Sequence, residues 1–153
     1  MPKGVSPTVD PVNLEIIRRL WDGRTPYSKI AKALGLTTNT VRTRVNKLIK
    51  SGILQIIGIV EIGALPGHSA AFVGFRIQPP LLKKAAETIR KLKGVVVSAS
   101  VSGRYDLMAV VMFNEDFTQR DFFYQEMAKV EGLISTETFF VFDSTNFNLR
   151  YVL

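Results

Sequence analysis

A segment rich in hydroxyl, amide and cationic side chains lies between residues 28 and 48. It contains four Thr, two Asn, two Arg and three Lys, and it has no Asp or Glu. Asn can pair with adenine, Thr can hydrogen-bond base edges or contact a thymine methyl, and Arg and Lys can bind guanine or phosphate. The composition indicates a helix that binds DNA, and a solvated helix face is the alternative.

Helical spacing separates an apolar side of this segment from a polar side. In a helix from about Thr38 to Ser51, steps of 100° per residue put the apolar residues together, and these are Val41, Val45, Leu48 and Ile49. The residues predicted to contact DNA are Asn39, Thr40, Arg42, Thr43, Arg44, Asn46, Lys47 and Lys50. The first turns of such a helix reach base edges, which favours Asn39, Thr40 and Thr43 for base contacts and the four cations for phosphate contacts.

The charge of the chain is concentrated in its first 60 residues. The net charge is +7, and residues 1–60 hold ten Lys and Arg against three Asp and Glu. Residues 61–153 hold ten of each kind and are neutral. Because neutralised phosphates release counterions, this asymmetry predicts a polyanionic partner for the N-terminal part. Double-stranded DNA is the partner we expect, and a basic surface without a partner is the alternative.

Three short helices are predicted to position the polar segment. Asp10 can cap the first helix, whose first turn suits Pro11, and Thr25 and Pro26 repeat this start for the second helix. Apolar residues recur at helical spacing in the first helix, and they are Ile16, Ile17, Leu20 and Trp21. Glycines follow all three helices. Two helices joined by a Gly-containing turn describe a helix-turn-helix, so residues 1–52 are predicted to form a DNA-binding domain.

A β-branched apolar run follows the third helix. Residues 53–62 read ILQIIGIVEI, a composition that predicts a strand. The sequence GALPGH then breaks the strand. Residues 53–68 are therefore predicted to be a connecting strand and linker.

Residues 69–153 are predicted to form a second domain from a strand–helix–strand unit repeated twice. Strands are expected at residues 70–77, 95–102, 106–113 and 133–142, and helices at 79–94 and 114–132. Glu115 and Asp116 are expected to cap the second of these helices. The pattern is the βαββαβ order of ferredoxin-like folds, so the fold class is α+β. Both helices would cover one sheet face, and the apolar residues of the other face predict a partner subunit.

The sequence GRTPYSKIAKALGLTTNTVRTRVNKLIKSGIL resembles the helix-turn-helix of the Lrp/AsnC (feast/famine) transcriptional regulators. The positions in step with that family's pattern are Gly23-Arg24, Ile30-Ala31, Gly35-Leu36, Val41, Arg44-Val45, Leu48 and Gly52-Ile53. The sequence VSGRYDLMAVV resembles the ligand-sensing and dimerisation (RAM) domain of the same family. The resemblance implies a winged-type helix-turn-helix followed by this domain, in homodimers that assemble further. It also implies sequence-specific regulation of transcription, modulated by an amino acid or a related small molecule.

The resemblance further implies an effector site between subunits, near the hairpin motif Gly-x-x-Asp. The residues that it carries over are Gly103, Arg104, Tyr105 and Asp106, with Thr136 and Thr138 on the facing strand. The Asp106 carboxylate could bind a ligand ammonium, and backbone amides near Gly103 could bind a ligand carboxylate. A tight turn and ordinary strand preference explain the same residues without a ligand.

An enzyme of the same architecture is the alternative to a regulator. The siroheme decarboxylases resemble Lrp/AsnC regulators but act on a tetrapyrrole, and His68 is the only histidine available for such chemistry. Acid–base catalysis requires an oriented partner and a pocket, whereas a lone His in a Gly-rich connection is typical of a loop. We therefore predict no catalytic residue, no metal site and no cofactor. A pure oligomerisation scaffold, the third interpretation, would leave the N-terminal charge unexplained.

The composition also limits the compartment. The 153 residues include no Cys, which excludes disulfides, thiol nucleophiles and Cys-ligated metals. The first residues lack the apolar core of a signal peptide, and the longest uncharged run, residues 62–75, is shorter than the roughly 20 apolar residues that span a bilayer. We expect a cytoplasmic protein without a membrane partner.

Overall fold

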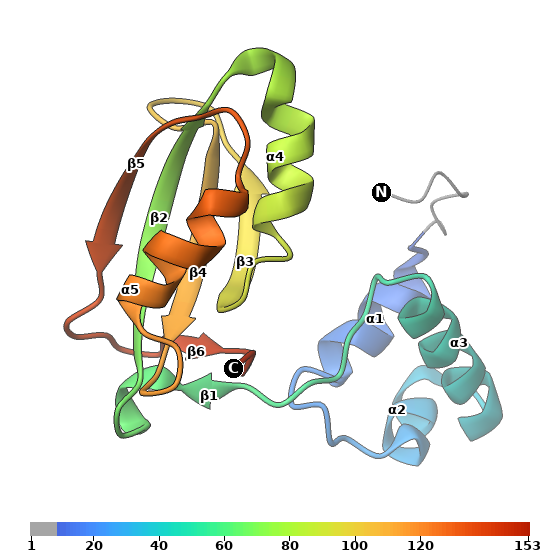
Figure 1. Cartoon of the computed structure of the whole chain (residues 1–153). Coiled ribbons are helices and arrows are strands. Elements are labelled where there is room, and N and C mark those ends of the chain that lie inside the picture. The colour runs from blue at the N-terminus through green and yellow to red at the C-terminus, as the bar shows by residue number, and fades with distance from the viewer. Residues whose placement is uncertain (1–8) are drawn as a thin grey trace. The chain divides into compact units, whose positions relative to one another are not determined.

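A computed structural model describes residues 9–153, which divide into two compact units. One unit ends at Ile57 and the other runs from Gly58 to Leu153 (Figure 1). This division falls inside the segment predicted to connect two domains. The functional boundaries at residues 52 and 68 stay predictions.

The N-terminal unit holds three helices: α1 (Pro11–Arg19), α2 (Tyr27–Leu34) and α3 (Thr38–Lys50) (Figure 1). α1 begins as predicted, because the Asp10 side chain accepts a hydrogen bond from the backbone N–H of Asn13 at 2.6 Å. α2 ends at Gly35, whose φ of +65° suits glycine. The core of the N-terminal unit consists of apolar residues from all three helices, namely Ile16, Leu20, Ile30, Ala31, Val41 and Val45.

Three details of this unit differ from the prediction. Thr25 does not cap α2, because Pro26 occupies the cap position and the Thr25 hydroxyl donates to Asp22 at 2.9 Å. Trp21 lies beyond the end of α1 and is 86% exposed. Ile49 is 41% exposed, so the buried side of α3 is narrower than its apolar pattern.

The predicted strand at residues 53–62 is wrong for most of its length. Only β1 (Val60–Glu61) forms, and it pairs with β6 (Asn148–Leu149). The residues before β1 are irregular and leave Ile56, Ile57 and Ile59 exposed. A β-branched run becomes a strand only when a partner strand accepts its backbone hydrogen bonds.

The C-terminal unit contains a four-stranded antiparallel sheet in the order β3-β4-β2-β5. Its strands are β2 (Ser69–Ile77), β3 (Val95–Ser100), β4 (Leu107–Phe113) and β5 (Leu133–Phe140). Helix α4 (Leu82–Ile89) connects β2 to β3, and α5 (Gln119–Asp121) begins the helical connection from β4 to β5 (Figure 1). The predicted α+β fold and its strand order along the chain are confirmed.

Both helical connections pack on the same face of this sheet. That face carries Val73 and Phe75 of β2, and Ile89 and Phe122 pack against it from the two helical connections. Phe122 is fully buried, whereas its neighbour Phe123 is only half-buried. None of the helices in residues 9–153 is long and apolar enough to cross a membrane.

The second helical connection starts at Thr118 and not at Glu115 and Asp116. The Thr118 hydroxyl accepts from the Asp121 backbone N–H at 3.3 Å, and the Asp121 carboxylate accepts from the Thr118 N–H at 2.9 Å. This reciprocal pair is a capping box, which satisfies two backbone donors at once. Beyond α5 the connection continues as a π-helical turn (Phe122–Glu126) and a 3-10 turn (Met127–Lys129).

The other face of the sheet is partly covered by the end of the chain. Phe147 and Leu149 pack with Ile62, Ala70 and Met112 at one end of this face. Large apolar side chains remain exposed on the rest of the face, and they are Phe72, Val97 and Phe139. The expectation of an uncovered apolar area on this face is therefore confirmed, although the covered part was not anticipated.

Candidate nucleic-acid interface

The start of α3 is held by two threonines. Thr37 caps the helix, because its hydroxyl accepts from the Thr40 backbone N–H at 3.1 Å. The hydroxyls of Thr37 and Thr40 also lie 2.8 Å apart and share a hydrogen bond. Thr40 was predicted to contact bases, but the structure places its hydroxyl within the cap.

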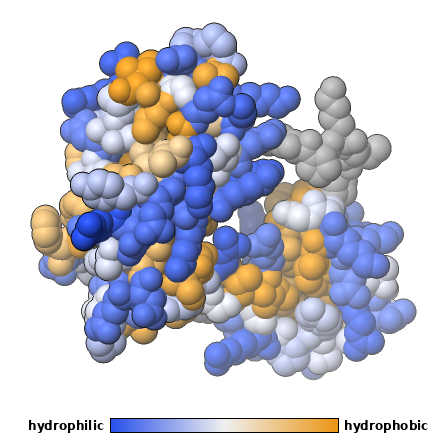
Figure 2. All heavy atoms as spheres, viewed as in Figure 1, coloured by the Kyte–Doolittle hydropathy of each residue, from blue (hydrophilic) through white to orange (hydrophobic). Residues whose placement is uncertain are grey.

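The outer side of α3 is exposed and carries no acidic residue. Burial of Val41, Val45 and Leu48 turns the remaining side chains outward. The exposed predicted residues are Asn39, Arg42, Thr43, Asn46, Lys47 and Lys50. Figure 2 shows hydrophilic residues along the side of this unit where α3 lies. Six of the eight predicted DNA contacts are thus brought onto one accessible face.

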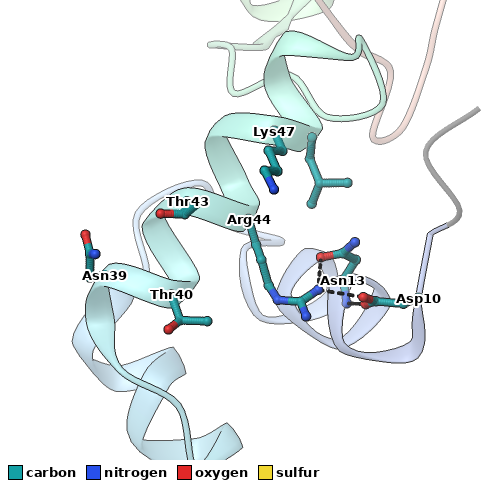
Figure 3. Close-up of a pocket in the computed structure, with 8 residues that line it drawn as sticks. Asp10, Asn13, Asn39, Thr40, Thr43, Arg44 and Lys47 are labelled. Carbon is teal, nitrogen blue, oxygen red and sulfur yellow. Dashed lines mark hydrogen bonds and ion pairs between the residues drawn. The ribbon is translucent and has the colours of Figure 1, made fainter. Parts of the chain in front are cut away.

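Arg44 ties α3 to the start of α1. One guanidinium nitrogen, Nη1, lies 2.6 Å from Asp10 Oδ2 and 3.0 Å from Asn13 Oδ1 (Figure 3). The hydrogen bond from Arg44, with the backbone N–H of Asn13, holds the pKa of Asp10 below its usual value. Arg44 was predicted to contact phosphate, and in this structure its charge is already paired. Capping was the only role predicted for Asp10, because no local sequence signal links residues that lie 34 positions apart.

A cavity of about 490 Å³ lies between α3 and the start of α1. Its lining includes Asp10 and Asn13 from the α1 side, and Asn39, Thr43 and Lys47 from α3 (Figure 3). The hollow presents amide, hydroxyl and ammonium groups together, which are the groups that bond base edges and phosphates. Within residues 9–153, Arg42, Lys47 and Lys50 form no ion pair, so their charges are available to phosphate.

A second polar cavity lies beside the loop between β3 and β4. It has a volume of about 340 Å³ and is lined by Arg76, Arg104, Tyr105, Ser135, Thr136 and Glu137. Three of the six predicted effector residues are therefore brought together here, and Arg76, Ser135 and Glu137 were missed. These three follow from the pairing of β2 with β5, which sequence spacing alone does not give.

Glu137 organises this second cavity. The Tyr105 hydroxyl donates to its carboxylate, and Arg104 Nη2 lies 3.1 Å from it. The hydrogen bond to Glu137 raises the pKa of Tyr105. The Tyr105 ring packs against Gly74 of β2, where any side chain would collide with it.

The other three predicted effector residues do not line this cavity. Asp106 Oδ2 accepts from the backbone N–H of Ile77 at 2.8 Å, so this carboxylate fastens the end of β2. Thr138 pairs with Val73, a residue of the core face. Gly103 belongs to the loop and has a φ of +128°, which suits glycine.

His68 lies outside these two cavities, lines a further cavity of about 470 Å³ with Glu61 and Asp143, and makes loop contacts. Its Nδ1 lies 2.9 Å from the Pro66 carbonyl oxygen, so Nδ1 carries the proton and donates. Its Nε2 then accepts from the Tyr151 hydroxyl at 3.2 Å. No carboxylate orients the ring, and the part of the chain that the structure describes has no group of three metal-ligating side chains.

Both units of the chain match known protein families. Residues 10–55 match a family of winged helix-turn-helix DNA-binding domains, and residues 70–148 match the Lrp/AsnC ligand binding domain. An uncharacterized HTH-type transcriptional regulator from Pyrococcus horikoshii is 31% identical over 85% of this chain and 84% of its own length.

Two solved structures share the fold. AsnC of Escherichia coli has a TM-score of 0.67 and 23% identity, covering 88% of this chain and 93% of its own. A transcriptional regulator from Neisseria meningitidis, solved with L-methionine, has a TM-score of 0.68 and 18% identity, covering 95% and 96%.

Proposed function

The chain belongs to the Lrp/AsnC family of transcriptional regulators, and we propose which of its residues read DNA and which bind an effector. As a member of that family it is a DNA-binding regulator with a ligand-binding domain, and not an enzyme. The siroheme-decarboxylase alternative has no support from the relatives, and His68 is a loop residue. We propose that the protein acts in the cytoplasm, where DNA is accessible to it.

Asn39 and Thr43 are the base-reading residues of this proposal, and Asn46 lies on the same exposed face. Arg42, Lys47 and Lys50 bind phosphates, since their charges are free of ion pairs among the described residues. Thr40 and Arg44 position the helix through the cap and the tie to Asp10. The observation that carries the proposal is the exposed, acid-free outer side of α3.

Fluorescence anisotropy tests this assignment. DNA from upstream of the protein's own gene is compared with unrelated DNA across a salt series. A bidentate Asn–adenine pair contributes about 1–3 kcal/mol of discrimination, so Asn39→Ala should lower the preference for the upstream DNA by about 5- to 150-fold. Gln119→Ala, which removes an exposed amide from the other unit, is the matched control. An unchanged preference in Asn39→Ala would remove Asn39 from the base contacts.

The effector that we propose is an amino acid bound in the cavity beside the β3–β4 loop. Arg76 and Arg104 supply guanidinium groups that bind a carboxylate, and Glu137 supplies a partner for an ammonium. The related fold from Neisseria meningitidis was solved with such a ligand.

Calorimetry with each of the common amino acids tests the effector proposal. Arg76→Ala should abolish the heat of binding, whereas Arg90→Ala removes an exposed charge elsewhere and should leave it intact. Arg76 is a sharper probe than Asp106, because the Asp106 carboxylate also fastens β2. Equal heats from wild type and Arg76→Ala would exclude this cavity as the site.

The partner that we propose for the uncovered sheet face is a second copy of this chain. The apolar residues there are Phe72, Val97 and Phe139, and their exposure in one chain favours burial in a dimer. From the family resemblance we further propose that such dimers assemble into larger oligomers. Phe139→Glu should shift the sedimenting mass toward the monomer, whereas Tyr124→Glu, at an exposed aromatic on the helical side, should not. A wild-type mass for Phe139→Glu would refute this interface.

A further inference from the structure

The only tryptophan of the chain stands in solvent at the turn between α1 and α2. Trp21 is 86% exposed, although a Trp side chain is large and mostly apolar. The Trp21 side chain belongs neither to the core of the three helices nor to the outer side of α3. An exposed Trp with an apolar ring and an N–H donor is typical of an interaction surface.

The surroundings of Trp21 are basic. A cavity of about 260 Å³ is lined by Arg18, Arg19, Trp21, Thr25, Lys29 and Ile30, which we name the Trp21 patch. Three of the six residues are cationic and none is acidic. The Arg18 side chain is 77% exposed, and its contact with Glu15 is long, at 3.6 Å. Glu15 is closer to Arg19, at 2.9 Å.

The acid nearest in sequence, Asp22, makes its hydrogen bonds within the turn. Asp22 Oδ1 accepts hydrogen bonds from the backbone N–H groups of Arg24 and Thr25, both at 3.0 Å, and from the Thr25 hydroxyl. These bonds hold the Asp22 carboxylate against the turn and lower its pKa, so it stays charged. The Trp21 patch is therefore a site with surplus positive charge and an exposed aromatic ring.

We propose that the Trp21 patch is a second DNA-contact site, which binds the phosphodiester backbone beside the segment read by α3. In a helix-turn-helix the helix before the recognition helix crosses the DNA backbone. Here that helix is α2, which begins at Tyr27, directly after the turn that holds Trp21. The patch thus lies at the end of the helix that must approach phosphates. This inference rests on the proposed DNA-binding function.

The chemistry of the patch fits a phosphodiester. Arg18 and Lys29 can bind phosphate oxygens, and the indole N–H of Trp21 is a further donor. The flat ring can pack on a deoxyribose, which is the apolar part of the backbone. None of these contacts reads a base, so the patch adds affinity without sequence preference.

Intrinsic fluorescence of the full-length protein gives the first test. Because Trp21 is the only tryptophan, its emission reports this one place. Titration with duplex DNA should change the Trp21 emission, with the same midpoint as the anisotropy of labelled DNA. Upstream and unrelated DNA should give the same limiting change at saturation.

The salt dependence of binding gives the second test. Each phosphate contact contributes a slope of about −0.9 to log K against log salt, so raising salt from 50 to 200 mM weakens it about 3.5-fold. Arg18→Ala should therefore lose about 3.5-fold less affinity than wild type over that range, equally for both DNAs. Arg90→Ala, an exposed charge on the other unit, should keep the wild-type slope.

The outcomes separate this inference from the function on which it rests. Failure of the wild type to bind any DNA would overturn the proposed function. Wild-type binding with unchanged Trp21 emission and a wild-type slope for Arg18→Ala would overturn only the second site. Emission that responds to an acidic protein or peptide but not to DNA would also overturn it.

Discussion

Gly74 offers the sharpest test of how the cavity beside the β3–β4 loop is built. A Cβ at this position would lie 2.7–2.8 Å from three ring carbons of Tyr105. Carbon atoms in contact are separated by about 3.5–4.0 Å, so the ring would have to move by roughly 1 Å. Gly74→Ala should therefore displace Tyr105 from its position over β2 and from Glu137.

The expected magnitude follows from two opposing effects. An added methyl group in a packed site costs about 1–3 kcal/mol. Replacing Gly by Ala in a strand restores about 0.5–1 kcal/mol, because the unfolded chain has fewer conformations to lose. Gly74→Ala should thus lower the free energy of unfolding by up to about 2.5 kcal/mol.

Urea unfolding of a double-mutant cycle measures the collision itself. In a Tyr105→Ala background the ring is absent, so Gly74→Ala should stabilise by about 0.5–1 kcal/mol. Gly63→Ala is the matched control, because a Cβ there meets no atom within 4 Å. If Gly74→Ala has the same effect with and without Tyr105, the ring does not pack on Gly74 and this account of the cavity is wrong.

Two further substitutions test features that the structure revealed. The pKa of Asp10 is lowered from 3.8, so the stability from its pairing with Arg44 is complete above about pH 4 and is lost as pH falls through the lowered value. Asp10→Asn should flatten the acid unfolding curve followed by circular dichroism, and an unchanged curve would contradict the pairing. Thr118→Ala should cost about 1 kcal/mol in urea unfolding through loss of the capping box, whereas Glu115→Ala should cost nothing measurable. The reverse order would restore the cap predicted from the sequence.

Local signals predicted the helical unit well. Asp10 before Pro11 marks the start of α1, and Gly35 marks the end of α2, because each acts through the backbone next to it. The apolar spacing of Val41 and Val45 then fixed which side of α3 faces outward. The exposure of six of the predicted DNA-contact residues follows from that orientation.

Signals that depend on distant partners were missed. The run at Ile56 and Ile57 has strand composition, but within residues 9–153 no strand lies beside it to accept hydrogen bonds. Glu137 lines the cavity beside the β3–β4 loop because β5 pairs with β2 in a register that places it opposite Gly74. Arg44 was predicted to contact phosphate. Its ion-pair partner, Asp10, lies 34 residues away, so local sequence did not show that the charge is paired. In each case the deciding contact is tertiary, so local spacing could not show it.

The tie between Arg44 and Asp10 separates two tasks that one helix must perform. Residues that hold α3 in place are buried or paired, whereas Asn39, Thr43 and Asn46 are exposed. Exposed positions of this kind accept substitution within about 0.5 kcal/mol. Under the proposed assignment of Asn39 and Thr43 to base contacts, gene duplicates could therefore acquire new target sequences by changes at these positions, without passing through unstable intermediates. The exposed residues of α3 can thus change during evolution, while the Arg44–Asp10 ion pair keeps the helix in position.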